Sequence, residues 1–347
     1  MVDRLVDIPL MAYANARSLH YISQYQVLSL ASMLLPGGVK PDPQLPIDDL
    51  VAEKDSLFQR DIANMRQGVY PVDVLAPENP VEHLARLPRI VADGLVMSVR
   101  RALNQTAAFD KEAQAYAVDL PKYYLRNFHH QTNGYLSETS AELYEHQVEM
   151  LFGGMADAMR RLVIAPMRQA FGRSDGKGLT FLELAAGTGR TTRFVKLAFP
   201  QAKIVALDLS HPYLKQAQRN LAGFSRIDYL QGDAAKLPFT DGQFDAVYSV
   251  FLFHELPLPV RQAVMAESRR VLKPGGFLGA VDSLQKGDRP AFDRVLAQFP
   301  KNYHEPFYPN YLQHPLPGLM GADDVAAVKT DFGGLAKVCW TRKAAAQ

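Results

Sequence analysis

The sequence predicts an α/β fold in its second half, a mostly parallel sheet with helices on both faces, preceded by an all-helical first half. Residues 180–190 place an apolar run and one acid before a turn that contains two glycines. This arrangement is typical of a buried strand that leads through a tight loop into a helix. After it, short apolar runs alternate with amphipathic segments, the pattern of parallel strands joined by crossover helices.

The first half carries apolar residues at helical spacing, interrupted by proline and glycine. Helices are expected at 11–35, 47–67 and 137–171, with two or three more within 79–120. Breaks are expected near Pro88 and Pro121, because proline cannot donate a backbone hydrogen bond. Ser137 can cap the last long helix, and Gly153 and Gly154 should weaken its middle.

Composition bounds the possible functions. The chain has 347 residues, enough for two domains, and 38 Lys and Arg against 36 Asp and Glu. The net charge of +2, with no basic stripe, disfavours nucleic acid as a partner. Cys339 is the only cysteine, which excludes internal disulfides and suits a reducing cytoplasm. No apolar run approaches the about 20 residues of a membrane span, and Asp3, Arg4 and Asp7 disfavour a secretory signal.

A glycine-rich segment divides the chain. Residues 172–178 contain three glycines among polar residues, which predicts a hinge between a helical domain at 1–171 and an α/β domain at 172–347. Ligands of open α/β sheets bind at the carboxyl edge of the strands, so the helical domain is expected to cover that edge as a lid. The alternative is an oligomerisation domain that forms a homodimer without touching the ligand.

Acids follow two of the expected strands. Asp208 ends the second strand, about 20 residues after Gly189, where an acid commonly holds the two hydroxyls of a nucleoside ribose. Asp233 follows a third strand at a polar tip. The apolar run 244–250 and the Lys-Pro-Gly-Gly turn within 272–277 complete an ordered set of five features.

This set resembles the class I S-adenosylmethionine (SAM)-dependent methyltransferases, especially those near the ubiquinone/menaquinone-biosynthesis C-methyltransferases. The resemblance covers roughly the second half of the chain. It implies a Rossmann-like sheet ending in an antiparallel hairpin, which the pair Gly333-Gly334 also favours. It further implies SAM as cofactor, S-adenosylhomocysteine as product and a small-molecule acceptor. Ala185 departs from the family, which usually has glycine at this position.

The resemblance also carries over cofactor-binding positions. The acid Glu183 should orient the glycine loop or reach the ammonium group of SAM, Leu209 should lie against the adenine, and Asp233 with Ala234 should bind its amino group. The full expected set is Glu183, Ala185, Gly187, Thr188, Gly189, Asp208, Leu209, Asp233, Ala234 and Ser249.

Three segments carry candidate acceptor-site residues. His254, after the fourth strand, has the side chain best suited to accept a proton near neutral pH, although it could instead bond only to the backbone. Residues 302–311 are rich in aromatic and polar groups, as are residues 123–135. The catalytic candidates are His254, Tyr303 and His304, and the substrate-binding candidates are Tyr123, Tyr124, His129, Phe253, Glu305, Tyr308 and Tyr311. Apart from these roles, both segments could simply pack the two domains together.

No metal site is expected, because the pair His129-His130 lacks ligand spacing with other His or Asp residues. A hydrophobic or aromatic acceptor is favoured over RNA or protein. A non-catalytic SAM-binding scaffold remains open, since the cofactor residues are compatible with it. A nicotinamide enzyme is disfavoured by Thr192, which stands where that fingerprint requires a third small residue.

Overall fold

The computed structural model describes residues 2–40, 42–76 and 80–345, and its second half is built on one seven-stranded sheet. The strands are β1 Thr180–Leu184, β2 Lys203–Asp208, β3 Ile227–Gln231, β4 Phe244–Val250, β5 Leu272–Ser283, β6 Lys329–Gly333 and β7 Ala336–Arg342. Their order is β3-β2-β1-β4-β5-β7-β6, with β1 to β5 parallel and β7 antiparallel to both its neighbours. The mostly parallel sheet and the C-terminal hairpin are therefore confirmed.

Helices cover both faces of this sheet because side chains alternate across each strand. Phe181 on β1 packs into the cluster that contains Phe194 of α8, whereas Leu182 packs into the cluster with Met265 of α10 and Met320 of α13. The helices of this half are α8 Arg190–Ala198, α9 His211–Asn220, α10 Leu258–Val271, α11 Asp293–Tyr303, α12 Tyr308–Tyr311 and α13 Leu316–Met320, with short 3₁₀ turns η4 Phe253–Glu255 and η5 Pro290–Phe292.

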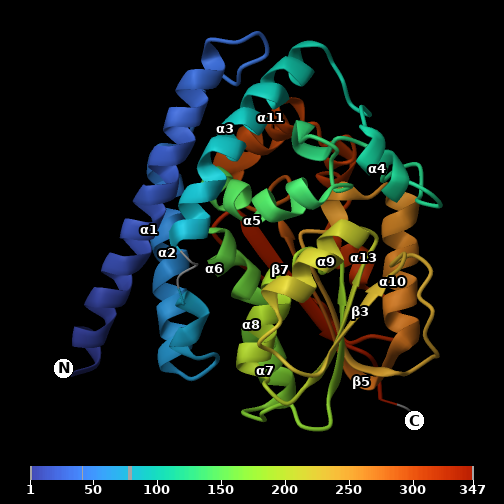
Figure 1. The fold of residues 1–347 in the computed structure, drawn as a ribbon. Helices are drawn as coiled ribbons and strands as arrows, with labels where there is room; N and C mark the ends of the chain where they lie inside the picture. Colours follow the sequence, from blue (N-terminus) through green and yellow to red (C-terminus); the bar gives the residue numbers. More distant parts are fainter. Residues whose placement is uncertain (1, 41, 77–79, 346–347) are drawn as a thin grey trace.

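The first half is helical, as expected. It comprises α1 Val2–Met33, α2 Ile47–Arg66, α3 Pro80–Ala102, α4 Lys111–Tyr116, α5 Glu138–Leu151, α6 Ala156–Arg160 and α7 Ile164–Phe171, with 3₁₀ turns η1 Val72–Leu75, η2 Phe128–His130 and η3 Arg161–Val163. In Figure 1, α3 and α5 lie with α11 above the sheet, and α1 runs along the outside of the molecule. Helices α6 and α7 instead join the core cluster on one face of the sheet.

The helix expected over 137–171 is interrupted after residue 151, as Gly153 and Gly154 predict. Ser137 caps α5, its hydroxyl accepting the Ser140 N–H at 3.1 Å, and the helix ends before Gly153 and Gly154. Both glycines have positive φ, and a Cβ on Gly154 would lie 2.9 Å from the Cα of Ser18 on α1. The glycine pair thus ends one helix and allows another helix to approach closely.

The predicted break at Pro88 is wrong, because α3 continues through it from Pro80 to Ala102. Proline removes the donor that the carbonyl of Leu84, four residues earlier, would otherwise accept from. Leu84 is 63% exposed, so water can satisfy that carbonyl. Solvent exposure of one helix face therefore lets the helix accommodate the proline.

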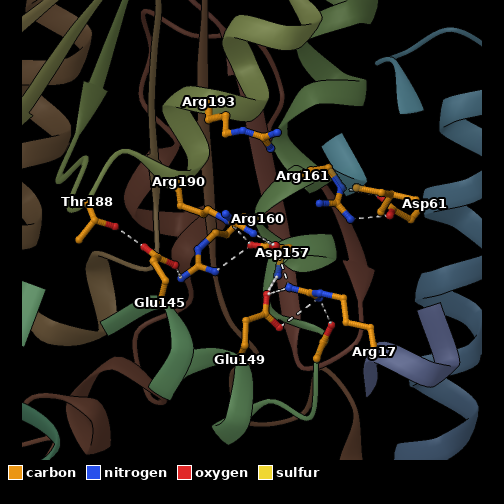
Figure 2. Close-up of polar contacts among 12 residues, drawn as sticks. Arg17, Asp61, Glu145, Glu149, Asp157, Arg160, Arg161, Thr188, Arg190 and Arg193 are labelled. Atoms are coloured by element: carbon orange, nitrogen blue, oxygen red, sulfur yellow. Dashed lines mark hydrogen bonds and ion pairs between the residues drawn. The ribbon is translucent and has the colours of Figure 1, made fainter. Parts of the chain in front are cut away.

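A buried ion network joins the two halves (Figure 2). Asp157 on α6 pairs with Arg190 on α8 at 2.5 Å, with Arg17 on α1 at 3.0 Å and with Arg160 at 3.3 Å. Glu149 on α5 binds Arg17 at 2.9 Å and accepts the Asp157 N–H at 2.9 Å. Burial by itself would raise the pKa of Asp157, but the three guanidinium groups hold it well below its usual range.

We expect Asp157→Asn to lower the free energy of unfolding by about 3–5 kcal/mol, because three largely buried arginines would lose their shared counter-charge. Urea unfolding followed by circular dichroism measures this. Asp228→Asn is the matched control, since the Lys203–Asp228 pair has side chains 49% and 58% exposed and should cost at most about 1 kcal/mol. Equal losses in the two variants would contradict the role given to the network.

Candidate functional site

A first cavity opens at the carboxyl ends of β1, β2 and β4. Seven of the expected cofactor residues line it, namely Ala185, Gly187, Thr188, Asp208, Leu209, Asp233 and Ala234, and so do Tyr123 and Tyr124. Ala185 has a φ of +56°, which explains why glycine suits this position. Glu183, Gly189 and Ser249 do not line the cavity. Gly189 instead caps α8 with φ at +80°.

Asp208 links the glycine turn after β1 to the loop after β2 at the floor of the first cavity. Its Oδ2 accepts the Gly187 N–H at 2.8 Å and its Oδ1 accepts the Ser210 N–H at 2.7 Å. Burial raises the pKa of Asp208 to about 6, although the two backbone donors favour its ionised form. Each carboxylate oxygen retains a lone pair, so the group could also accept a pair of ligand hydroxyls. Ser210 caps α9, its hydroxyl accepting the Tyr213 N–H at 3.1 Å.

Glu183 lies beneath the glycine turn rather than in the cavity. Its Oε2 accepts hydroxyl hydrogen bonds from Thr192 at 2.6 Å and Tyr248 at 2.9 Å. Burial raises the pKa of Glu183 to about 7, and the two hydroxyl donors only partly oppose this shift. Its observed contacts are therefore those of a residue that orders the start of α8.

Four charged residues outside the expected set line the same cavity, namely Glu145, Arg160, Arg190 and Glu255. Arg160 binds Glu145 at 2.8 Å, and Glu145 also accepts the hydroxyl of Thr188 (Figure 2). A guanidinium and a carboxylate side by side could bind the carboxylate and the ammonium of an amino acid. Both Glu145 and Arg160 lie on helices far from the glycine turn in sequence. A charged residue on an amphipathic helix usually lies on a solvated face. The local sequence around Glu145 and Arg160 therefore does not indicate a binding role.

Aromatic side chains form the roof of the first cavity. Tyr135, Tyr144 and Tyr213 pack edge to face with ring centroids 5.3–5.9 Å apart, and Phe128 stacks on Tyr135 at 5.4 Å. All four line the cavity. Of these, Tyr135, Tyr144 and Phe128 come from the helical half, so that half forms part of the cavity wall.

A second, mainly apolar cavity lies next to the first and encloses about 1270 Å³ of empty space, including its opening to solvent. Its apolar walls come mainly from α1, α3, α5 and α11, with Leu28, Ile90, Met150, Leu296 and Phe299 among them, and Phe152 directly after α5 adds to them. His129, His254, Tyr303 and Tyr308 of the expected acceptor site line it. Tyr144, Phe251 and Glu255 line both cavities and so form a shared wall.

His254 faces the second cavity as part of a buried pair with Asp282. The ring Nδ1 lies 2.6 Å from Asp282 Oδ1, while Asp282 Oδ2 accepts the Phe253 N–H at 2.7 Å. This fixes Nδ1 as the donor and leaves Nε2 free of a hydrogen bond to Asp282. Burial alone would lower the pKa of His254, but Asp282, with Glu305 and Glu255, raises it to about 9.

A second histidine lies close to two carboxyl groups at the shared wall. His129 Nε2 is 3.7 Å from Glu255 Oε1, and its Nδ1 is 3.1 Å from Glu305 Oε1. Tyr135 donates to Glu255 at 2.6 Å. Burial raises the pKa of Glu305 to about 7, and burial alone would lower that of His129, which Glu305 and Glu255 raise.

Most of the other residues expected at the acceptor site contact protein groups or line neither cavity. Tyr303 bonds through its hydroxyl to Tyr25 at 2.9 Å, and Tyr311 donates to the Ser283 carbonyl at 2.6 Å. His304 lies beside His130, with ring centroids 5.4 Å apart. Phe253, His304, Glu305 and Tyr311 line neither cavity, so the 302–311 segment contributes Tyr303 and Tyr308 to the second cavity.

The fold and the position of the first cavity are typical of α/β proteins that bind nucleosides, and comparison with known proteins specifies the family. A family model described as a methyltransferase domain matches residues 181–276. The chain is 33% identical over 186 residues to the ubiquinone/menaquinone biosynthesis C-methyltransferase UbiE of Desulfotalea psychrophila, covering 53% of this chain and 67% of that protein. It is 32% identical over 147 residues to a fatty-acid O-methyltransferase of Mycolicibacterium smegmatis, covering 42% of this chain and 52% of that protein.

Among solved structures, a SAM-dependent methyltransferase from Aquifex aeolicus is similar with a TM-score of 0.35 and 20% identity, covering 52% of this chain and 88% of that one. The chain belongs to the SAM-dependent methyltransferases, and its cofactor is SAM. It spans about half the length of the fatty-acid methyltransferase. No helix within the described residues is both long and apolar enough to cross a membrane.

Glu183 makes the stability of the fold depend on pH. Its pKa is about 7 in the folded protein against a usual 4.5, so its contribution to stability is present below pH 4.5 and is lost as pH rises through 7. Glu183→Gln removes the ionisable group but keeps an acceptor for the two hydroxyls. Between pH 5 and 8 we expect the variant to gain about 2–3 kcal/mol of unfolding free energy relative to the wild type. Urea unfolding at both pH values measures this, and parallel profiles would contradict it.

Proposed function

We propose that this protein transfers the methyl group of SAM to a small hydrophobic acceptor bound in the second cavity. The observation that carries the proposal is the wall formed by Tyr144, Phe251 and Glu255, which borders both cavities. A methyl donor in one cavity and an acceptor in the other would meet there. This is the contact that an in-line displacement requires.

In this proposal the first cavity holds SAM from end to end. Asp208 accepts the two ribose hydroxyls, and Asp233 binds the adenine amino group. At the other end, Arg160 binds the methionine carboxylate and Glu145 the ammonium group. The Arg160–Glu145 contact of 2.8 Å supports this, because the two side chains already lie side by side with opposite charges.

The nature of the acceptor is inferred from the second cavity. Its walls carry aliphatic and aromatic side chains from four helices, and its polar groups are few, including His129, His254 and Glu255. Such a cavity favours an apolar molecule with one reactive polar group. Two similar proteins are named for a fatty acid and for ubiquinone/menaquinone biosynthesis, which supports a fatty or quinone-like acceptor.

His254 is proposed as the group that handles the proton of the acceptor. The acceptor atom forms a bond to the methyl carbon as the carbon–sulfur bond breaks, and the electron pair goes to sulfur to give neutral S-adenosylhomocysteine. With a pKa of about 9, His254 accepts the acceptor's proton at Nε2 only in its neutral form, while Asp282, 2.6 Å from Nδ1, orients the ring and stabilises the charge that it then carries. If the acceptor binds already ionised, the same protonated ring lies beside the anion.

The other catalytic candidates receive no such role. The Tyr303 hydroxyl is bonded to Tyr25, and His304 lines neither cavity. For the helical half, residues 1–171, we propose a lid domain whose residues 123–135 and helix α5 exclude water from both cavities. Tyr135 and Tyr144, which border the first cavity, support this assignment.

To test the function, purified protein with SAM is offered a long-chain fatty acid, an alkylated hydroquinone and a polar phenol, and methylated products are identified by mass spectrometry. We expect turnover of an apolar acceptor. His254→Gln should lower kcat by about 10²–10⁴-fold, because the proton acceptor is lost, with the affinity for S-adenosylhomocysteine retained. His314→Gln, at a half-buried histidine outside both cavities, is the control. Turnover of only the polar phenol would refute the proposed acceptor class.

The ribose role of Asp208 makes cofactor affinity depend on pH. Hydroxyls donate to the ionised carboxylate, and the pKa of Asp208 is about 6. We therefore expect the affinity for S-adenosylhomocysteine to be constant above pH 7 and to fall about tenfold per pH unit well below 6. Calorimetry at several pH values measures this. Asp208→Asn should bind more weakly at pH 8 and show a flat profile; wild-type affinity in that variant would exclude the role.

A further inference from the structure

One group of side chains at the shared wall has the composition of a metal site. His129, Glu255 and Glu305 each offer a ligand atom, and these atoms lie within 4.8 Å of one another; no other such group occurs among residues 2–40, 42–76 and 80–345. Ligand atoms bound to one cation at about 2.0–2.2 Å are about 3–4 Å apart. The 3.1 Å between His129 Nδ1 and Glu305 Oε1 matches this spacing, whereas Glu255 Oε1 lies 3.7 Å from the other ring nitrogen, Nε2, which also bonds to the Tyr135 hydroxyl.

The burial of Glu305 and its lack of hydrogen-bond donors are a second, independent reason to expect a bound ion. The residue is only 1% exposed, and neither of its carboxylate oxygens has a hydrogen-bond partner among the described residues. His129 Nδ1 is near Oε1 but is not aligned to form a hydrogen bond with it, and it is likewise buried without a partner. A buried carboxyl group whose two oxygens both lack donors is costly unless something else binds it.

The balance of charged groups around Glu305 also favours a bound cation. Asp282, Glu255 and Glu305 contribute three carboxyl groups around only two histidines, and Asp282 is already paired with His254. The described residues that line the second cavity include no lysine or arginine. Even with both rings protonated, the three carboxyl groups exceed the two histidines by one negative charge, which a divalent cation in place of the His129 proton would neutralise.

We propose that His129, Glu255 and Glu305 bind one divalent transition-metal ion at the wall between the two cavities. One imidazole and two carboxylates suit ions such as Mn²⁺ or Zn²⁺ better than Mg²⁺ or Ca²⁺, which prefer oxygen ligands alone. The three residues come from η2, η4 and the loop after α11, so the site forms only when the helical half is docked on the sheet. When bound, the ion would supply positive charge for an acceptor oxygen.

The test measures metal directly and needs neither acceptor nor turnover, so its failure is distinct from failure of the proposed methyl transfer. Protein freed of metal with a chelator is dialysed against MnCl₂ or ZnCl₂, desalted, and its metal content determined by mass spectrometry. We expect about one ion per chain. Glu305→Gln and His129→Gln should each weaken binding by at least about tenfold, while His314→Gln should bind like the wild type.

Two measurements keep the test decisive. Affinity for S-adenosylhomocysteine reports whether each variant is folded. In the wild type, pulsed electron paramagnetic resonance of bound Mn²⁺ should show coupling to an imidazole nitrogen, which needs no variant at all. A wild-type protein that retains no metal, a bound ion without nitrogen coupling, or a folded Glu305→Gln variant with unchanged affinity would each overturn the proposal.

Discussion

The buried carboxylate of Asp157 is the interaction on which the rest of the arrangement depends. It contacts arginines from α1, α6 and α8, and α8 is the helix that starts at the glycine turn. Buried ion pairs often add little net stability, because desolvation offsets attraction. They do restrict geometry, since each charge has to be matched. The network therefore fixes where the helical half docks, and with it the positions of Glu145 and Arg160 at the first cavity.

Burial acts on the carboxyl groups of the site in different ways, depending on which donors each one meets. Asp208 receives two backbone N–H groups and keeps a pKa of about 6, whereas Glu183 receives two hydroxyls and has a pKa of about 7. Asp157, surrounded by guanidinium groups, stays ionised at any physiological pH. Glu305 receives no hydrogen bond from any residue that the structure describes, which distinguishes it from the other three.

The sequence could predict the sheet, the glycine turn and the position of Asp208, because each depends on a short local pattern. The apolar strand, the left-handed glycines and the acid at a strand end are all encoded within a few residues. The contacts of His129 with Glu305 could not be predicted, because these residues are far apart in the chain and meet only through the docking of the two halves. The helix break predicted at Pro88 is wrong for the opposite reason. The local tendency of proline to end a helix is overridden by the solvent exposure of that helix face.

The shared wall links these points to the proposed chemistry. Tyr144 and Glu255 reach both cavities from α5 and η4, one from each half of the chain. A methyl donor and an apolar acceptor have opposite requirements, since SAM needs charged and polar partners and the acceptor needs a dry, apolar surface. Two adjoining cavities with different linings meet both requirements, and only the few residues between them have to tolerate both environments. The titratable side chains of His129, His254 and Glu255 lie at or beside that boundary, where the proposed methyl transfer would require a proton acceptor.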